Sequence, residues 1–466
     1  MRLSLPNTTY ILAEYREGWP VVVAKASQYI AALLAGVFAV LASSESHALP
    51  SFAVQTDQPC SACHVGAFGP RLKQQGRDFK LYGYVSNDTK EHGLPISFMA
   101  EASFTHTSKD EIANVLAGYH ANDNLSFNEL GMFYAGKLFN KVGAFIEVSY
   151  DAIEKSLHWE DFDVRYTREE EMFGHDAVIG LSLNNAPTVT DMWEVSPGWS
   201  FPFATSGLAA APRAGSLIEA LPGTVFGPGV YGMFDNTVYL EADLYQGLDR
   251  SELRFLGKEP LNGDDRLSGP AFYWRAVLQQ EFGEGVHYAS IGTYGLIAKA
   301  YPSFVTAFGT DRYTDIGLDA TYQWLPHPER STSDMFEAHV LYLHEDARLG
   351  ASAIVSGANP SDSFSQSHLD LTYDFGATVT PTVQYFTTWG TNDGAFWGTP
   401  SGSPNSAGWV AQLDYVPWGK PDAPLPWLNG RISLQYVAYS KFDGSDAHAS
   451  NNNTLFLNFT VGAAAN

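Results

Sequence analysis

Apolar and polar side chains alternate along most of the chain from Pro95 onward, in segments of about ten residues. Gly, Asn, Asp and Pro separate one segment from the next. Successive side chains of a β-strand point to opposite faces, so a period of two predicts strands with one apolar and one polar face. Clear examples begin at Ile96, Val142, Val238, Ile316, Leu369 and Ile432.

Strands of this kind build two architectures. A soluble sandwich turns the apolar face inward, whereas an outer-membrane barrel turns it toward lipid and keeps a polar lumen. Carboxylates recur on the polar face of nearly every segment, and aromatic residues such as Trp324, Trp389 and Trp409 gather near segment ends. We count about 16 segments, an even number as bacterial barrels require. We therefore predict an all-β outer-membrane antiparallel β-barrel over residues 95–466, with the sandwich as the alternative.

One long segment, residues 184–229, interrupts this rhythm with six prolines at positions 187, 197, 202, 212, 222 and 228. It is too long for an idle loop. We expect it to fold into the lumen or to cap one mouth of the barrel. The C-terminus departs from the usual barrel pattern, because the chain ends on Asn466 rather than on an aromatic residue.

The N-terminus predicts export. Lys25 precedes an apolar run at 29–42, and Ser46, His47 and Ala48 form a small-x-small cleavage site. A membrane-spanning helix is the alternative, but the run is shorter than the ~20 residues that a bilayer requires. We assign residues 1–48 to a signal peptide with an N-terminal extension. Together with the barrel pattern, this predicts a protein of the bacterial outer membrane, in contact with its lipid.

Charge and cysteine content narrow the possible partners. The chain has 27 basic and 51 acidic residues, a net charge of −24, which argues against nucleic acid and favours cationic or neutral partners. It has only two cysteines, Cys60 and Cys63, so a disulfide framework is excluded.

These cysteines belong to the sequence CSACH at 60–64, the C-x-x-C-H pattern of c-type haem attachment. Two thiols add to the haem vinyl groups, and the next residue, His64, becomes the proximal iron ligand. A structural zinc site would need four ligands, a thioredoxin-like pair would need a βαβ context, and a plain disulfide would leave His64 without a role. We predict one covalent haem c on Cys60, Cys63 and His64.

The haem segment is short, residues 49–94, and too small to bury a haem alone. We therefore expect it to be a plug inside the lumen. It contains the most basic stretch of the chain, with Arg71, Lys73, Arg77 and Lys80. Either one or two of these side chains neutralise haem propionates, or they form a solvated basic face.

A sixth iron ligand should come from nearby. Met99, His92 and His106 are the candidates. If Phe98 faces lipid, then the alternation directs Met99 into the lumen and His106 toward lipid, while His92 lies in a linker. Met99 is thus the candidate distal ligand, and simple packing of Met99 against the plug is the alternative.

An N-terminal C-x-x-C-H segment joined to a barrel resembles the outer-membrane monohaem cytochrome–porin fusions of iron-oxidising bacteria. The matching stretches are FAVQT at 52–56, PCSACH at 59–64, GRDFKLYGY at 76–84, NNAPTVTDMW at 184–193 and PGW at 197–199. The resemblance runs over the whole mature chain. It implies oxidation of extracellular Fe(II), with electrons passed across the outer membrane to a periplasmic electron carrier.

The resemblance does not determine the electron donor. Acidic residues of the lumen and loops would attract Fe²⁺, but they also serve as ordinary porin lining. Three other functions stay open: electron transfer with a different extracellular donor or acceptor, a porin-like diffusion channel with a structural or sensory haem, and a haem enzyme such as a peroxidase. The last of these needs an open sixth coordination position.

Overall fold

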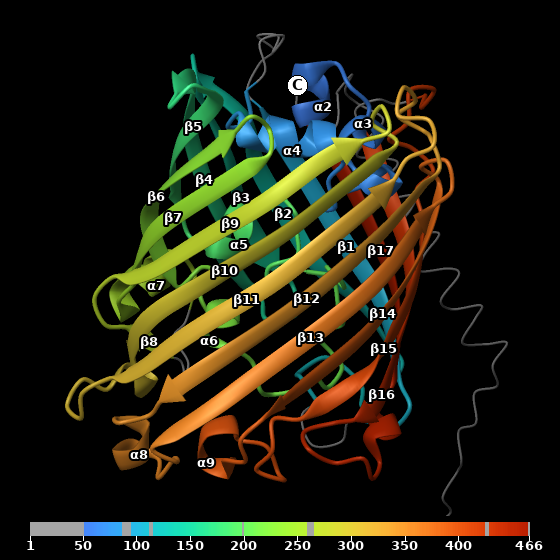
Figure 1. Cartoon of the computed structure of the whole chain (residues 1–466). Coiled ribbons are helices and arrows are strands. Elements are labelled where there is room, and N and C mark those ends of the chain that lie inside the picture. The colour runs from blue at the N-terminus through green and yellow to red at the C-terminus, as the bar shows by residue number, and fades with distance from the viewer. Residues whose placement is uncertain are drawn as a thin grey trace, which may run out of the picture. The chain divides into compact units, whose positions relative to one another are not determined.

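The computed structural model describes residues 51–85, 95–110, 115–197, 200–258, 265–424 and 428–464 (Figure 1). The predicted signal peptide and its extension lie outside the described residues, as do His92 and Trp199. Within these ranges, no helix is long and apolar enough to cross a membrane.

Antiparallel strands form a ring, because β1 pairs with both β2 and β17. Seventeen strands are described, and sixteen of them form the ring. The seventeenth, β8, has only two residues and pairs with the end of β10 without forming part of the ring. The prediction of about 16 strands is therefore confirmed. The strands are β1 (Ile96–Thr107), β2 (Asn124–Phe139), β3 (Val142–Asp151), β4 (Ser156–Met172), β5 (His175–Asn184), β6 (Val225–Phe234), β7 (Val238–Gly247), β8 (Arg266–Leu267), β9 (Ala271–Phe282), β10 (His287–Tyr301), β11 (Asp311–Trp324), β12 (Met335–Arg348), β13 (Ser361–Asp374), β14 (Val379–Gly390), β15 (Ser406–Tyr415), β16 (Leu428–Lys441) and β17 (Thr454–Ala464).

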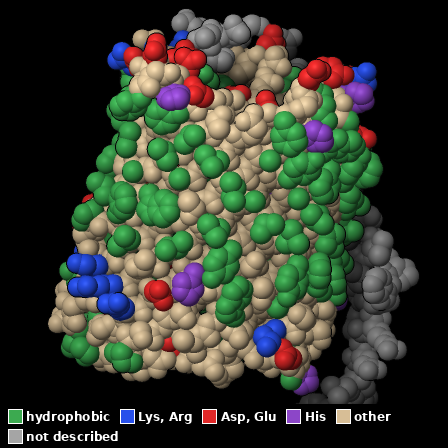
Figure 2. Space-filling view, viewed as in Figure 1, with side chains coloured by type: hydrophobic (Ala, Val, Ile, Leu, Met, Phe, Trp, Pro, Cys, Tyr) green, Lys and Arg blue, Asp and Glu red, His purple; other side chains and the backbone are tan. Residues whose placement is uncertain are grey.

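The two faces of the barrel differ as the alternation predicts. On β7, Leu240 and Leu244 are half exposed on the outside, whereas Glu241 and Asp243 are buried inside. Hydrophobic side chains are spread over the visible outer surface between its two ends, whereas charged side chains gather toward the ends (Figure 2). A ring of strands leaves no unpaired edge in the hydrocarbon, and an apolar outer face suits lipid. The chain is therefore an outer-membrane β-barrel, and the sandwich alternative is wrong.

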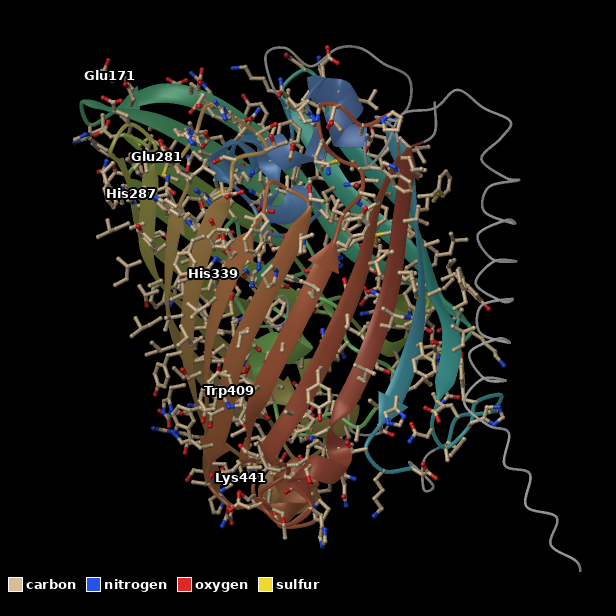
Figure 3. The ribbon with its side chains drawn as sticks, turned by 90° about the vertical axis from the view of Figure 1, so that its right-hand side faces the viewer. Glu171, Glu281, His287, His339, Trp409 and Lys441 are labelled. Carbon is tan, nitrogen blue, oxygen red and sulfur yellow. The ribbon has the colours of Figure 1, made fainter. Side chains whose placement is uncertain are left out.

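The two ends of the barrel carry different connections. At one end, called here the short-turn end, strands are joined by turns such as 140–141, 173–174 and 235–237. At the other, the long-loop end, loops such as 108–123 and 349–360 are longer. Figure 3 shows Glu171 and Glu281 toward the first end and Lys441 at the second. Bacterial barrels have short periplasmic turns and long extracellular loops, which assigns the short-turn end to the periplasm.

Short helices lie at the short-turn end and in the loops (Figure 1). The residues before the barrel, 51–85, are called here the N-terminal segment. The helices, with η marking 3₁₀ turns, are α2 (Ser51–Thr56), α3 (Cys60–Cys63), η1 (Val65–Ala67), α4 (Gln74–Leu81), α5 (Pro187–Thr190), α6 (Leu217–Ala220), α7 (Arg250–Phe255), η2 (Pro302–Phe304), α8 (Ser352–Val355), α9 (Gly394–Trp397) and η3 (Ala449–Asn452).

The proline-rich segment is shorter than expected. It connects β5 and β6 and is called here the internal segment, residues 185–224, because β6 already begins at Val225. The boundary at 229 was wrong because Pro228 lies within a strand. The pairing of β6 with β7 is interrupted between Phe226 and Gly229. Proline has no N–H to donate, so a strand tolerates it where the pairing is interrupted.

Candidate functional site

The C-x-x-C-H motif at 60–64 forms a single helical turn. Cys60 and Cys63 begin and end α3, and the His64 backbone N–H donates to the Cys60 carbonyl at 2.9 Å. Residues three apart in a helix lie on the same face, so both thiols are presented on one side with His64 directly after them. Both cysteines are free thiols.

The His64 ring is oriented by the chain that follows it. His64 and Leu72 form an isolated β-bridge, and His64 Nδ1 lies 3.3 Å from the carbonyl oxygen of Arg71. Metal-binding histidines commonly use one ring nitrogen for a carbonyl in this way, which directs the other toward the metal. Burial lowers the pKa of His64 to about 4, which favours the neutral imidazole, the form that binds metal.

Burial also shifts the pKa values of the two thiols. It raises the pKa of Cys60 to about 11 and, together with the nearby Cys60, the pKa of Cys63 to about 12. Within the described ranges, no group of three His, Cys, Asp or Glu side chains is arranged to hold a metal ion. Two unbridged thiols beside one held imidazole fit a haem attached through thioethers.

Close packing of α4 supports the motif. The Lys73 backbone N–H donates to the Cys63 carbonyl at 2.8 Å. A Cβ at Gly76 would lie 2.5 Å from that carbonyl oxygen and 2.8 Å from the Leu72 side chain. Any residue larger than glycine at this position would therefore push α4 away from the cysteines.

The four basic residues of the N-terminal segment are all buried. Arg71 forms ion pairs with Glu337 at 2.9 Å and Asp370 at 2.6 Å, on the inner faces of β12 and β13. Lys73 Nζ donates to the carbonyls of Ser61 and Ser331 at 2.9 and 3.0 Å.

The other two basic residues, Arg77 and Lys80, also contact partners inside the barrel. Arg77 donates to the Leu72 carbonyl at 2.8 Å and lies 3.8 Å from the ring centroid of Tyr288. Lys80 Nζ donates to the Asp191 carbonyl at 2.7 Å and pairs with Glu194 at 3.0 Å. The prediction of a solvated basic face is therefore wrong, because these charges anchor the segment to the lumen wall and the internal segment. Their role toward haem propionates stays a prediction.

A cavity lies beside the motif. Gly69, whose added Cβ would be 3.5 Å from the His64 ring, contributes to its lining together with Phe68, Arg71, Phe201 and Arg431.

The sequence prediction missed Arg431. Its Nη1 donates to the Gly69 carbonyl at 3.1 Å, its guanidinium lies 4.6 Å from the Phe68 ring centroid, and its buried Nε has no partner among the described residues. Alternation on β16 could have revealed it, since Arg431 is an inward-facing cation in an acidic barrel.

Met99 stands at the same level of the wall as the motif. On β17, Gly462 is directly opposite both Met99 of β1 and Asn429 of β16. Asn429 lies within hydrogen-bonding reach of the Cys60 thiol and donates to the Ala67 carbonyl at 2.7 Å. Two strand spacings separate Met99 from Asn429, about 10 Å, and the glycine between them has no side chain.

The predicted parity of β1 is confirmed. Phe98 is 42% exposed on the outside, whereas Ser97 and Ser103, which share the parity of Met99, are buried. His106 is exposed and pairs with Asp123 at 2.7 Å, which excludes it as an iron ligand.

The internal segment crosses the lumen. Asp191 accepts from the backbone N–H groups of Trp193 and Ser196 and lies 3.3 Å from Arg275 of β9. Burial raises the pKa of Asp191, but the charge of Arg275 and these hydrogen bonds outweigh it, so the pKa is held below its usual value.

Farther along, the internal segment reaches the opposite wall. Gln384 of β14 donates to the Phe201 carbonyl at 2.5 Å, and Gln435 of β16 donates to the Ala204 carbonyl at 3.0 Å. The described parts of the segment thus bridge β9 to β14 and β16 inside the lumen. Still farther along, Arg213 is exposed and donates to the Gly398 carbonyl of loop 391–405, so the segment also reaches the long-loop mouth.

No family model matches the chain, and no curated protein matches it. Among solved structures it is similar to bacterial outer-membrane barrels. The outer membrane channel DcaP of Acinetobacter baumannii is 12% identical, with 79% of this chain and 96% of that chain covered and a TM-score of 0.41. The anion-selective porin from Comamonas acidovorans is 10% identical, with 79% and 98% covered and a TM-score of 0.43. Salmonella typhi OmpF, in complex with daunomycin, is 10% identical, with 79% and 96% covered and a TM-score of 0.44. The strand pairings themselves establish the barrel.

Proposed function

We propose that this porin-like barrel is an outer-membrane electron-transfer protein with one covalent haem c on Cys60, Cys63 and His64. The observation that carries the proposal is the C-x-x-C-H turn itself, whose two thiols and oriented imidazole lie against the inner wall of a membrane-spanning barrel. A haem there would supply a reversible one-electron iron couple.

The chain's own residues supply attachment, orientation and shielding. Cys60 and Cys63 would tether the group, His64 would ligate its iron, and the Arg71 carbonyl holds the His64 ring in place. Met99 is the proposed distal ligand, since it faces the lumen at the level of Asn429. Leu81 of the N-terminal segment packs with Met192 and Trp193 of the internal segment in one buried cluster, which keeps water from between them.

We propose extracellular Fe(II) as the electron donor and a periplasmic electron carrier as the acceptor. Net charge −24 attracts cations to the protein, and a redox group inside the barrel spares the cell from importing iron. The resemblance to cytochrome–porin fusions supports this choice of donor. Because the same acids would also line an ordinary porin, the donor has to be tested directly.

The second candidate is a diffusion channel with a structural or sensory haem. A ring of sixteen strands favours it, since barrels of this size commonly leave an aqueous channel. The contacts of the internal segment with Gln384 and Gln435 oppose it, because they lead the chain across the lumen.

Spectroelectrochemistry of the purified protein with Fe(II), followed by conductance in planar bilayers, separates the two. Reduction of a covalent haem by Fe(II), with little conductance, is the expected result. A covalent haem that Fe(II) does not reduce would refute Fe(II) as donor and leave electron transfer with another donor. Porin-sized conductance with a covalent haem that Fe(II) does not reduce would favour the channel, and the absence of any covalent haem would refute both candidates.

A further inference from the structure

Three basic side chains lie in a row across adjacent strands on the outer face of the barrel. Lys299 of β10 is directly opposite Arg312 of β11, and Arg312 is directly opposite Arg348 of β12. All three are exposed, and they share the outward parity of the apolar residues Ile297 and Ile316. We call Lys299, Arg312 and Arg348 the cation row.

The cation row lies where the apolar belt meets the long-loop end. Lys299 is two residues beyond Ile297, which is 56% exposed, and loop 302–310 follows shortly after it. Loop 349–360 begins directly after Arg348. Figure 2 shows a group of Lys and Arg side chains at the lower left of the surface, and Figure 1 shows the ends of β10, β11 and β12 there. Since long loops are extracellular, this is the headgroup level of the outer leaflet.

The described residues place no ion-pair partner beside the cation row. Among the residues that the structure describes, none of the three side chains contacts a carboxylate. Asp346 is on the same face, but it is opposite Thr314 and is contacted by His344 at 3.5 Å. Asp311 is buried inside, where the Ser352 hydroxyl and backbone donate to it. Like charges directly opposite each other destabilise a sheet, so an external anion would stabilise the row.

We propose that the cation row binds the phosphate groups of lipopolysaccharide, the lipid of the outer leaflet. Its lipid A headgroup carries phosphates above several acyl chains. The phosphates would meet the cation row, and the acyl chains would cover apolar residues such as Ile297 and Ile316. Guanidinium groups bind phosphate through paired parallel hydrogen bonds, and two of the three members are arginines. This inference goes beyond the proposed function and does not depend on the haem.

The test is native mass spectrometry of the intact mature protein in detergent, titrated with bisphosphorylated lipid A or with its dephosphorylated form. A variant with Lys299→Gln, Arg312→Gln and Arg348→Gln should lose affinity for bisphosphorylated lipid A at least about tenfold. The matched control replaces the exposed Arg168 and Arg330 and the partly exposed Lys441 with Gln. It removes the same charge from side chains that already pair with Glu170, Glu329 and Asp446, and should bind lipid A as the wild type does.

Several outcomes would overturn the proposal. The proposal is wrong if the cation-row variant binds lipid A as the wild type does. It is also wrong if the control variant loses as much affinity for lipid A as the cation-row variant. A third such outcome is equal binding of both lipid A forms by the wild type, a comparison that holds even if the variant does not fold. Displacement of lipid A by inorganic phosphate would indicate a free-anion site, and equal binding of phosphatidylglycerol would indicate general attraction of anionic lipids.

Discussion

Arg71 and Asp370 form an ion pair at 2.6 Å although 299 residues separate them in the sequence. The same guanidinium contacts Glu337 at 2.9 Å, and all three side chains are buried. Arg71 follows the haem motif, whereas the two acids belong to neighbouring strands of the barrel wall. This ion-pair group therefore fixes the N-terminal segment inside the lumen.

Replacing Arg71 with Gln should loosen that segment. Removing one partner of a buried ion pair typically costs about 3–5 kcal/mol, because the remaining charge stays buried without compensation. We expect faster amide hydrogen exchange in 51–85, with the barrel strands unchanged. Arg168→Gln, which breaks an exposed pair with Glu170, should leave exchange as it is.

A neutralised variant separates charge from packing. Combining Arg71→Met with Glu337→Gln and Asp370→Asn removes the cation and both acids together, and this should recover much of the lost protection. Normal protection in Arg71→Gln alone would show that the ion pairs do not anchor the segment.

Covalent haem should depend on the two thiols and not on the rest of the turn. We expect the double variant Cys60→Ala/Cys63→Ala to lose all haem staining on a denaturing gel. Ser61→Ala changes a buried side chain of the same turn without touching a thiol, and it should keep its haem. Staining of the double variant would refute the attachment site.

Met99→Ala should lower the reduction potential and abolish the weak near-infrared sulfur-to-iron band of the ferric protein. A thioether ligand stabilises ferrous iron relative to a second histidine, so its loss favours the ferric state. Phe98→Ala, on the outward face of the same strand, should change neither property.

If the native protein lacks that band, Met99 is not the ligand. His92 then becomes the candidate, and a five-coordinate iron would instead support the peroxidase alternative.

Packing of the internal segment in the lumen should weaken as the pH rises from about 4.5 to about 7. Burial raises the pKa of Glu194 to about 7, an effect that Lys80 offsets in part and Asp191 adds to. The packed segment therefore keeps a proton on Glu194 that an opened, solvated segment releases near pH 4.5, so stability falls with rising pH across this interval. Asp161 and Arg165 also face Glu194, so a comparison of variants is needed.

Glu194→Gln isolates that contribution. Hydrogen exchange in 185–197, measured from pH 4.5 to 8, should vary less with pH in this variant than in the wild type, after correction for intrinsic exchange. Glu154→Gln removes a carboxyl whose side chain is 68% exposed, and its profile should match the wild type. Identical profiles for Glu194→Gln and the wild type would contradict the assignment.

The alternation of apolar and polar residues was enough to predict most of the fold. Alternation alone places Leu240 outside and Glu241 inside, because a strand's side chains alternate whatever its partner is. The same reasoning placed Phe98 and Met99 correctly. The prediction was wrong at Pro228, which was assigned to a loop but lies in β6. An interruption of the hydrogen bonds between two strands does not change the alternation of side chains, so the sequence pattern could not reveal it.

The haem motif is likewise local, since a single helical turn brings Cys60 and Cys63 to one face. The partners of the basic residues were not predictable in this way. Arg71 resembles a solvated charge in its own neighbourhood, and only the closed barrel brings Asp370 to it.

By itself, the sequence determined the strands, their inward and outward faces, the even strand count and the C-x-x-C-H turn. Tertiary structure alone decided which residues meet: Arg71 with Glu337, Met99 level with Asn429, and the three members of the cation row in register. The physical reason is that periodicity is a property of a few consecutive residues. Register depends on turns and on the stagger that closes the ring, so it is set by the whole barrel at once.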